Sequence, residues 1–153
     1  MRGARFRSRF ETGSSVLIDT APLIYHLEDI QPWSELTTIA FDLIAADQVK
    51  GFVSAISVAE LLVKPLAAGA ETAAPVEAFL LSMPNTTIAG IDYEVARKAA
   101  QVRARSTLRT ADALLVATAI VLGIDLLLTN DGRLEPAAES EGVKIILLSR
   151  FIS

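Results

Sequence analysis

Short apolar runs that alternate with longer segments of helical periodicity constrain the fold of this chain more than any other feature. Runs of strand length occur at residues 16–18, 52–53, 86–89, 125–128 and 143–148. Between them, apolar residues recur at helical spacing over residues 20–27, 33–47, 56–66, 75–83, 92–106 and 110–122. Strands separated by helices form parallel sheets with helices on both faces. The pattern therefore predicts one α/β domain, a three-layer α/β/α arrangement around a five-stranded parallel sheet.

The third helical segment, at 56–66, has an irregular end. Pro65 lies in its last turn, where we expect it to end or kink the helix. Residues 67–74 are small and weakly patterned, which fits either a loop or a helix hairpin.

Residues 1–15 differ in charge from the rest of the chain. They contain Arg2, Arg5, Arg7, Arg9 and a single acid, Glu11, although the whole chain carries a formal net charge of -4. No apolar segment follows the arginines, so they do not form a secretory signal. We expect residues 1–15 to be a disordered basic arm or an extension foreign to the native protein, and residues 16–153 to form the domain.

The composition narrows the chemistry that the domain can perform. Apolar residues make up 52% of the chain, which is enough to bury a core. Cysteine is absent and His26 is the single histidine, which excludes disulfides and thiolate chemistry and leaves little material for a catalytic triad. Carboxylates remain as ligands, and they favour Mg²⁺ or Mn²⁺. The longest apolar run, at 113–124, is shorter than the ~20 residues of a membrane span, so we expect a soluble cytoplasmic protein with no membrane contact.

Acidic residues occur where a parallel sheet binds ligands. Asp19 ends the first predicted strand and Asp131 follows the fourth, so both belong to the carboxyl edge of the sheet. Glu60 lies one turn into the helix after the second strand, and Asp112 lies in the first turn of the apolar helix at 110–122. The fold could bring all of them into one crevice.

Each acid also has a structural interpretation. Asp19 could bond to nearby backbone amides, Asp112 is favoured by the helix dipole, and Asp131 suits the Asn-Asp-Gly turn. Glu60 would complete a capping box that begins at Ser57. If the four do meet, however, like charges ~4 Å apart repel by about 4 kcal/mol at an effective dielectric near 20, which a divalent cation would offset.

Four segments of the chain resemble the motifs of PIN-domain ribonucleases, specifically the VapC-type toxins of prokaryotic toxin–antitoxin pairs. These segments are VLIDTAPLIY at 16–25, SAISVAEL at 54–61, LRTADALLVATA at 108–119 and LLLTNDGRL at 126–134. They occur in the family's order and with suitable spacing from Val16 to the C-terminus. One departure is Ala21, where the family often has Ser or Asn.

The resemblance implies a compact α/β/α domain that cleaves RNA endonucleolytically and leaves a 5′-phosphate and a 3′-hydroxyl. It implies that Asp19, Glu60, Asp112 and Asp131 hold one or two Mg²⁺ or Mn²⁺ ions. In this hypothesis Asp19, Asp112 and Asp131 form the metal set, and Glu60 binds directly or through water, or orients the attacking water. It also implies a small antitoxin protein that docks over the site.

Other side chains are candidates for supporting roles. Thr129 could hold a ligand carboxylate in place or simply bond to the backbone at the strand end. Arg97, Arg105 and Arg109 belong to a basic stripe that could contact RNA phosphates or form a solvated helix face. The high apolar content suggests a homodimer.

Two other functions compete with the toxin interpretation. The first is a PIN-like binding module that has lost activity. The second is a phosphotransfer enzyme of the haloacid-dehalogenase type, whose phosphatases need a second acid two residues after the first; Ala21 stands there.

Overall fold

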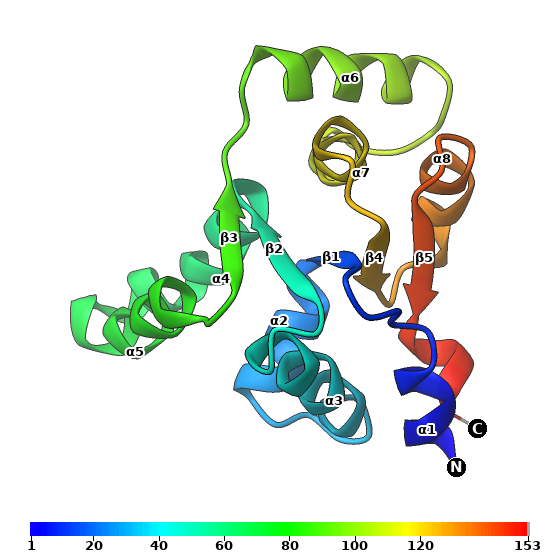
Figure 1. Cartoon of the computed structure of the whole chain (residues 1–153). Coiled ribbons are helices and arrows are strands. Elements are labelled where there is room, and N and C mark those ends of the chain that lie inside the picture. The colour runs from blue at the N-terminus through cyan, green and yellow to red at the C-terminus, as the bar shows by residue number, and fades with distance from the viewer. Residues whose placement is uncertain (153) are drawn as a thin grey trace.

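The computed structural model describes residues 1–152, and they form a five-stranded parallel sheet in the order β3-β2-β1-β4-β5. The strands are β1 (Ser15–Ile18), β2 (Lys50–Ser54), β3 (Thr86–Ala89), β4 (Leu126–Thr129) and β5 (Lys144–Leu147). β1 lies between β2 and β4, as Figure 1 shows. The order along the sheet reverses beside β1, which makes the carboxyl ends of β1 and β4 the expected ligand-binding edge.

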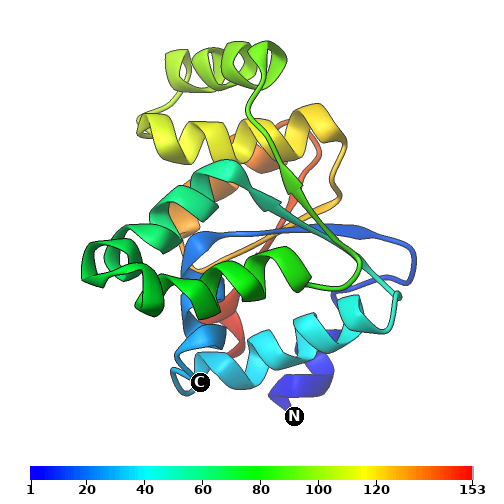
Figure 2. The same cartoon turned by 90° about the vertical axis from the view of Figure 1, so that its left-hand side faces the viewer.

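Helices connect successive strands and cover both faces of the sheet (Figure 2). They are α1 (Arg2–Arg7), α2 (Thr20–Leu27), α3 (Trp33–Ala45), α4 (Ala55–Ala68), α5 (Ala70–Ser82), α6 (Tyr93–Ala104), α7 (Thr110–Leu122) and α8 (Glu135–Glu139). Short 3₁₀ turns, η1 (Gly132–Leu134) and η2 (Leu148–Phe151), follow β4 and β5. None of the helices within residues 1–152 has the length and apolar character needed to cross a membrane.

Alternate residues of the central strands enter two separate cores. Val16 and Ile18 of β1 pack on the face covered by α1 to α5, whereas Leu17 packs on the face covered by α6, α7 and α8. In β4, Leu127 likewise faces away from its neighbours Leu126 and Leu128. Because both faces are buried, these strands are apolar except for Ser15 at the start of β1 and Thr129 at the end of β4. The predicted three-layer α/β/α fold is confirmed.

The N-terminal residues differ from the disordered arm expected of them. Residues 2–7 form α1, and Phe6 is completely buried within the core that also contains Phe10 and Phe151. The Phe6 ring contacts Phe10 and Phe151 edge-on, with centroids 5.2 Å and 5.3 Å apart. The prediction of disorder is wrong for these residues because it weighed the arginines and overlooked the aromatic side chains between them.

The segment around Pro65 also departs from the expected boundaries. α4 continues through Pro65 to Ala68, and α5 begins at Ala70 and contains Pro75. Gly69 joins the two helices with φ +135°, a conformation that L side chains rarely adopt. Of the two expectations for residues 67–74, the helix hairpin is therefore the one observed.

Candidate functional site

Asp19 is fixed at the end of β1 by bonds to both of its carboxylate oxygens. Its backbone N–H donates to the Leu128 carbonyl oxygen of β4 at 3.0 Å. Oδ1 accepts a hydrogen bond from the Thr20 N–H at 2.7 Å and thereby caps α2. Oδ2 accepts from the Thr129 hydroxyl at 2.7 Å. The side chain is thus oriented by the start of one helix and the end of the neighbouring strand.

Glu60 points toward the start of α2 rather than toward the start of its own helix. Its Oε1 accepts a hydrogen bond from the Thr20 hydroxyl at 2.7 Å. The cap of α4 is Ser54, whose hydroxyl oxygen accepts from the Ile56 N–H at 3.1 Å, while Ser57 lies buried within the helix. The capping-box interpretation of Glu60 is therefore wrong. Thr20 joins Asp19 to Glu60, because its N–H bonds to one acid and its hydroxyl to the other.

Asp112 and Asp131 share a guanidinium. Asp131 follows β4 and caps η1, and its carboxylate accepts from the Nε and Nη2 atoms of Arg133 at 3.0 Å and 2.6 Å. The same Nη2 atom lies 3.7 Å from Oδ2 of Asp112, in the first turn of α7. Sequence reasoning missed Arg133, although its place two residues after Asp131 was a usable signal.

The charges of the four acids act on one another. Burial raises the pKa of the Asp19 carboxyl above its ordinary value, the charges of Glu60 and Asp112 raise it further, and the hydrogen bonds from Thr129 and Thr20 oppose the rise. Burial also raises the pKa of Asp112, and the charges of Asp131 and Glu60 add to it. These mutual effects link all four acids at one edge of the sheet.

Asp131 behaves in the opposite way. The hydrogen bonds from the Arg133 side chain lower the pKa of the Asp131 carboxyl below its ordinary value. Within residues 1–152, no three His, Cys, Asp or Glu side chains already stand close enough together to form a metal-binding group. Arg133, which lies between Asp131 and Asp112, and Arg109 supply positive charge at this edge.

The chemistry of the four side chains nevertheless fits a hard divalent cation. All are carboxylates, and oxygen is the ligand atom that Mg²⁺ and Mn²⁺ prefer. Burial is the main cause of the raised pKa values of Asp19 and Asp112, and the charges of neighbouring carboxylates add to the rise.

Thr129 is completely buried and connects two of the acids. Its hydroxyl donates to Asp19 Oδ2 at 2.7 Å and accepts from the Asp131 N–H at 3.0 Å. The hydroxyl thus contacts both a carboxylate and the backbone, so the two interpretations made from the sequence each describe part of its bonding.

The predicted basic residues lie at different distances from the acids. Arg109 immediately precedes α7, and its charge lowers the pKa of Asp112, so it belongs to the surroundings of the acids. Arg97 is exposed on α6, and Arg105 is exposed at the position directly after its end. Throughout residues 1–152, no hydrogen bond or ion pair joins either of them to the four acids. Their role in substrate binding stays a prediction.

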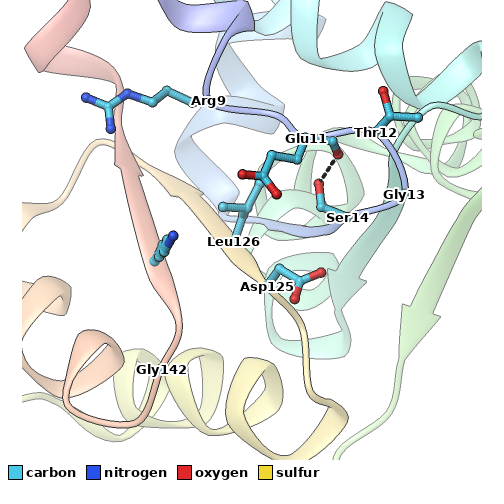
Figure 3. Close-up of a pocket in the computed structure, with 9 residues that line it drawn as sticks. Arg9, Glu11, Thr12, Gly13, Ser14, Asp125, Leu126 and Gly142 are labelled. Atoms are coloured by element: carbon cyan, nitrogen blue, oxygen red, sulfur yellow. Dashed lines mark hydrogen bonds between the residues drawn. The ribbon is translucent and has the colours of Figure 1, made fainter.

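Two cavities lie at different edges of the sheet. One, of about 700 Å³, is a largely apolar groove between α2, α4 and α5 that has Glu60 in its wall. The other, of about 360 Å³, lies at the opposite, amino edge of the sheet and is shown in Figure 3. Its wall includes Ser14, Asp125 and Lys144, which precede or begin β1, β4 and β5.

A family comparison decides what kind of domain carries this site. The model of the PIN domain matches residues 16–140 of the chain. The chain belongs to the PIN-domain family. The motif resemblance seen in the sequence is thereby confirmed at the level of the family. No curated protein matches the sequence.

Solved structures share the fold at low sequence identity. FitAcB from Neisseria gonorrhoeae matches with a TM-score of 0.67 and 24% identity, over 88% of this chain and 98% of that chain. DNA-bound VapBC from Salmonella typhimurium matches with a TM-score of 0.65 and 20% identity, over 88% and 98%. VapBC-5 from Mycobacterium tuberculosis, a member of the VapBC family of toxin–antitoxin systems, matches with a TM-score of 0.57 and 21% identity, over 88% and 98%.

Proposed function

We propose that this PIN domain is a Mg²⁺- or Mn²⁺-dependent endoribonuclease and the toxin of a type II toxin–antitoxin pair. The observation that supports the proposal is that Asp19, Glu60, Asp112 and Asp131 lie at the carboxyl edge beside β1, where burial, and to a lesser degree the charges of neighbouring acids, raise the pKa of Asp19 and Asp112. Stability alone does not favour such a cluster. Resemblance in fold to structures of toxin–antitoxin proteins adds support.

The four carboxylates are the residues that would hold the metal. A bound Mg²⁺ or Mn²⁺ supplies a water of lowered pKa and neutralises the charge of a phosphodiester. Thr129 and Thr20 position the carboxylates: the first bonds to Asp19, and the second to Asp19 and Glu60. A site held in this way needs little reorganisation when substrate arrives.

Arginines near the acids would bind the RNA backbone. Arg109 and Arg133 flank Asp112, and the side chain of Arg133 is 67% exposed, so it can turn from Asp131 toward a phosphate. A guanidinium suits this task because it forms paired hydrogen bonds with phosphate oxygens.

The experiment that tests the nuclease is cleavage of a structured RNA by the purified protein. We expect cleavage with Mg²⁺ or Mn²⁺, none in EDTA, and none by Asp19→Asn or Asp112→Asn. Robust cleavage in EDTA would exclude the metal-dependent mechanism. Cleavage unchanged in both variants would identify the activity as a contaminant.

The partner that we propose is an antitoxin whose apolar segment occupies the groove between α2, α4 and α5. Val63 and Leu66 of α4 are exposed by 65% and 52%, and Glu60 lies in the groove wall, so an occupant would also cover Glu60. Val63→Glu should abolish complex formation with the antitoxin encoded beside this chain, whereas Leu81→Glu, at an exposed apolar residue of α5 outside the groove wall, should not. Equal binding by both variants would place the antitoxin elsewhere.

The expected homodimer stays a prediction, which sedimentation equilibrium tests.

One observation favours a second candidate, a PIN-like binding module without turnover. Arg133 already neutralises Asp131 and approaches Asp112. Under the nuclease proposal, Arg133→Ala should tighten Mn²⁺ binding in calorimetry because it removes a competing cation. Arg150→Ala is the matched control, since Arg150 forms a similar exposed pair with Glu135 at 2.6 Å. A wild-type protein and an Arg133→Ala variant that both bind no Mn²⁺ would favour the binding module.

A further inference from the structure

α1 is an ordered part of the molecule that lies outside the matched family domain, which begins at residue 16. Phe6 anchors it in the core, and it packs against α3 and η2. Two arginines of this region, Arg5 and Arg9, lie over the ring of Phe151. Their guanidinium carbons are 5.2 Å and 5.9 Å from the ring centroid. An anchored helix of this kind presents its charges in defined positions.

The charge of α1 and its flanking residues is positive, and one of its arginines, Arg2, lies 3.7 Å from Glu35 of α3 in an exposed ion pair. Arg2, Arg5, Arg7 and Arg9 are all exposed, and residues 1–10 contain no acid. The remainder of the chain is acidic and would repel a polyanion. α1 therefore adds exposed cationic groups, outside the PIN domain, to Arg109 and Arg133 beside the acids.

The apolar side of α1 is already used within the protein. Phe6 is completely buried and Phe10 is 8% exposed, so neither ring is available to enter a lipid bilayer. Peripheral helices bind membranes through an exposed apolar face together with basic residues. With that face buried, the arginines suit a flexible polyanion rather than a membrane surface.

A chain of hydrogen bonds connects α1 to the loop that carries Asp131. Nη2 of Arg5 donates to the Arg150 carbonyl oxygen at 2.8 Å, and the neighbouring Ser149 N–H donates to Oδ1 of Asn130 at 3.0 Å. Asn130 directly precedes Asp131 in the chain. Figure 1 shows α1 beside the C-terminal segment, on the side toward which the arrows of β4 and β5 point.

We propose that the arginines of α1 form a docking surface for the RNA backbone outside the segment held at the four acids. The inference rests on the proposed nuclease function and adds to it a substrate-binding surface outside the PIN domain. An RNA that reaches from the acids across η2 to α1 gains contacts with Arg2 and Arg7, whereas a short RNA held at the acids does not.

The test compares RNA binding by two charge-matched variants in an Asp112→Asn background, which prevents cleavage. Arg2→Gln/Arg7→Gln leaves the Arg5 contacts intact. Lys50→Gln/Lys144→Gln removes two exposed charges at the amino edge. For an RNA of about 30 nucleotides, the arginine variant should bind about tenfold more weakly at low salt, and its slope of log affinity against log salt should fall by about 1.4, the value for two single-strand phosphate contacts.

The controls separate this proposal from the nuclease proposal. For an RNA of about 6 nucleotides, both variants should match the background, and Arg2→Lys/Arg7→Lys should keep the affinity for the long RNA. Equal binding of the long RNA by the arginine and lysine-to-glutamine variants overturns the docking surface while leaving the nuclease intact. Wild-type protein that neither binds nor cleaves RNA overturns both. If Arg2→Gln/Arg7→Gln loses binding to phosphatidylglycerol vesicles but keeps its affinity for the long RNA, the RNA-docking surface is overturned. The arginines would then bind a membrane surface instead.

Discussion

The two edges of the sheet carry similar residues but differ in how the residues are combined. At the amino edge, Asp125 directly precedes β4, and its Oδ2 accepts from the N–H and hydroxyl of Ser15 at 2.9 Å and 3.1 Å. At the carboxyl edge, four acids act on one another and the pKa values of two are raised. An aspartate beside a strand is therefore not by itself a site; repulsion between partly buried carboxylates is the distinguishing property.

We expect the largest difference between the two edges in the rate of RNA cleavage. Asp112→Asn should lower RNA cleavage by ~10²-fold or more. Loss of a metal ligand should cost at least as much activity as loss of a residue that only holds such a ligand in place. Asp125→Asn should leave the cleavage rate near that of the wild type. Initial rates at saturating Mg²⁺ measure both. Comparable loss in the two variants would mean that the edges do not differ in function.

A smaller effect is expected at the hydroxyl that supports the acids. Thr129→Val should lower cleavage by about 10- to 100-fold, since the Asp19 carboxylate loses its bond to the hydroxyl. Thr118→Val is the control, because Thr118 is equally buried but bonds to the Leu114 carbonyl oxygen within α7. Both should lose about 1 kcal/mol of unfolding free energy in urea titrations. Equal activity of the two variants would remove the positioning role from Thr129.

At the amino edge the expected effect is on stability alone. Asp125→Ala should lower the free energy of unfolding by about 1 kcal/mol, because it leaves the Ser15 N–H without its acceptor. Cleavage and Mn²⁺ binding should be unchanged. Chemical denaturation and calorimetry check the two expectations, and a parallel loss of Mn²⁺ affinity would join this edge to the site.

The smallest effect concerns pH and has opposite signs for two neighbouring acids. A raised pKa means that the folded protein binds the proton more tightly, so the charge of Asp112 destabilises the fold at neutral pH and this cost fades as pH falls through its raised pKa. The lowered pKa of Asp131 means that its charge stabilises the fold at neutral pH, and this contribution is lost as pH falls through the folded-state pKa.

In EDTA at pH 7, Asp112→Asn should therefore raise the melting temperature by about 1–3 °C, and Asp131→Asn should lower it by a similar amount. The Asp112→Asn difference should shrink as the pH falls toward the raised pKa of Asp112, whereas the Asp131→Asn difference should persist to about pH 4 and shrink only below it. Thermal melts from about pH 3 to pH 8 measure this. A shift of the same sign in both variants would contradict the assigned electrostatics.

The sequence predicted the architecture because the fold depends on patterns that local chemistry imposes. Strands buried on both faces must be apolar throughout, and the alternation of strands and helices leaves few topologies. α1 was missed because Phe6 and Phe10 stand among arginines and do not form an apolar run. The fold nevertheless buries Phe6 completely. The sequence predicted that Pro65 would end or kink its helix, whereas α4 continues through it. The helix can do so because a proline one turn from a helix end removes a single hydrogen bond.

The acids could be predicted from their places after strands or near the start of helices. The residues that bond to them could not. The bond from Thr20 to Glu60 joins residues on different helices, and no local spacing encodes it. The contact of Arg133 with Asp112 likewise depends on how η1 meets α7. Such contacts follow from tertiary packing, which brings distant segments together only after the sheet has formed.

Calorimetric titration of Mn²⁺ into the wild type, Asp112→Asn and Asp125→Asn tests the central claim most directly. The account predicts saturable binding by the wild type and by Asp125→Asn, and loss of that binding in Asp112→Asn. Binding of equal strength in Asp112→Asn, or none in the folded wild-type protein, would contradict the claim that the carboxyl-edge acids form a divalent metal site.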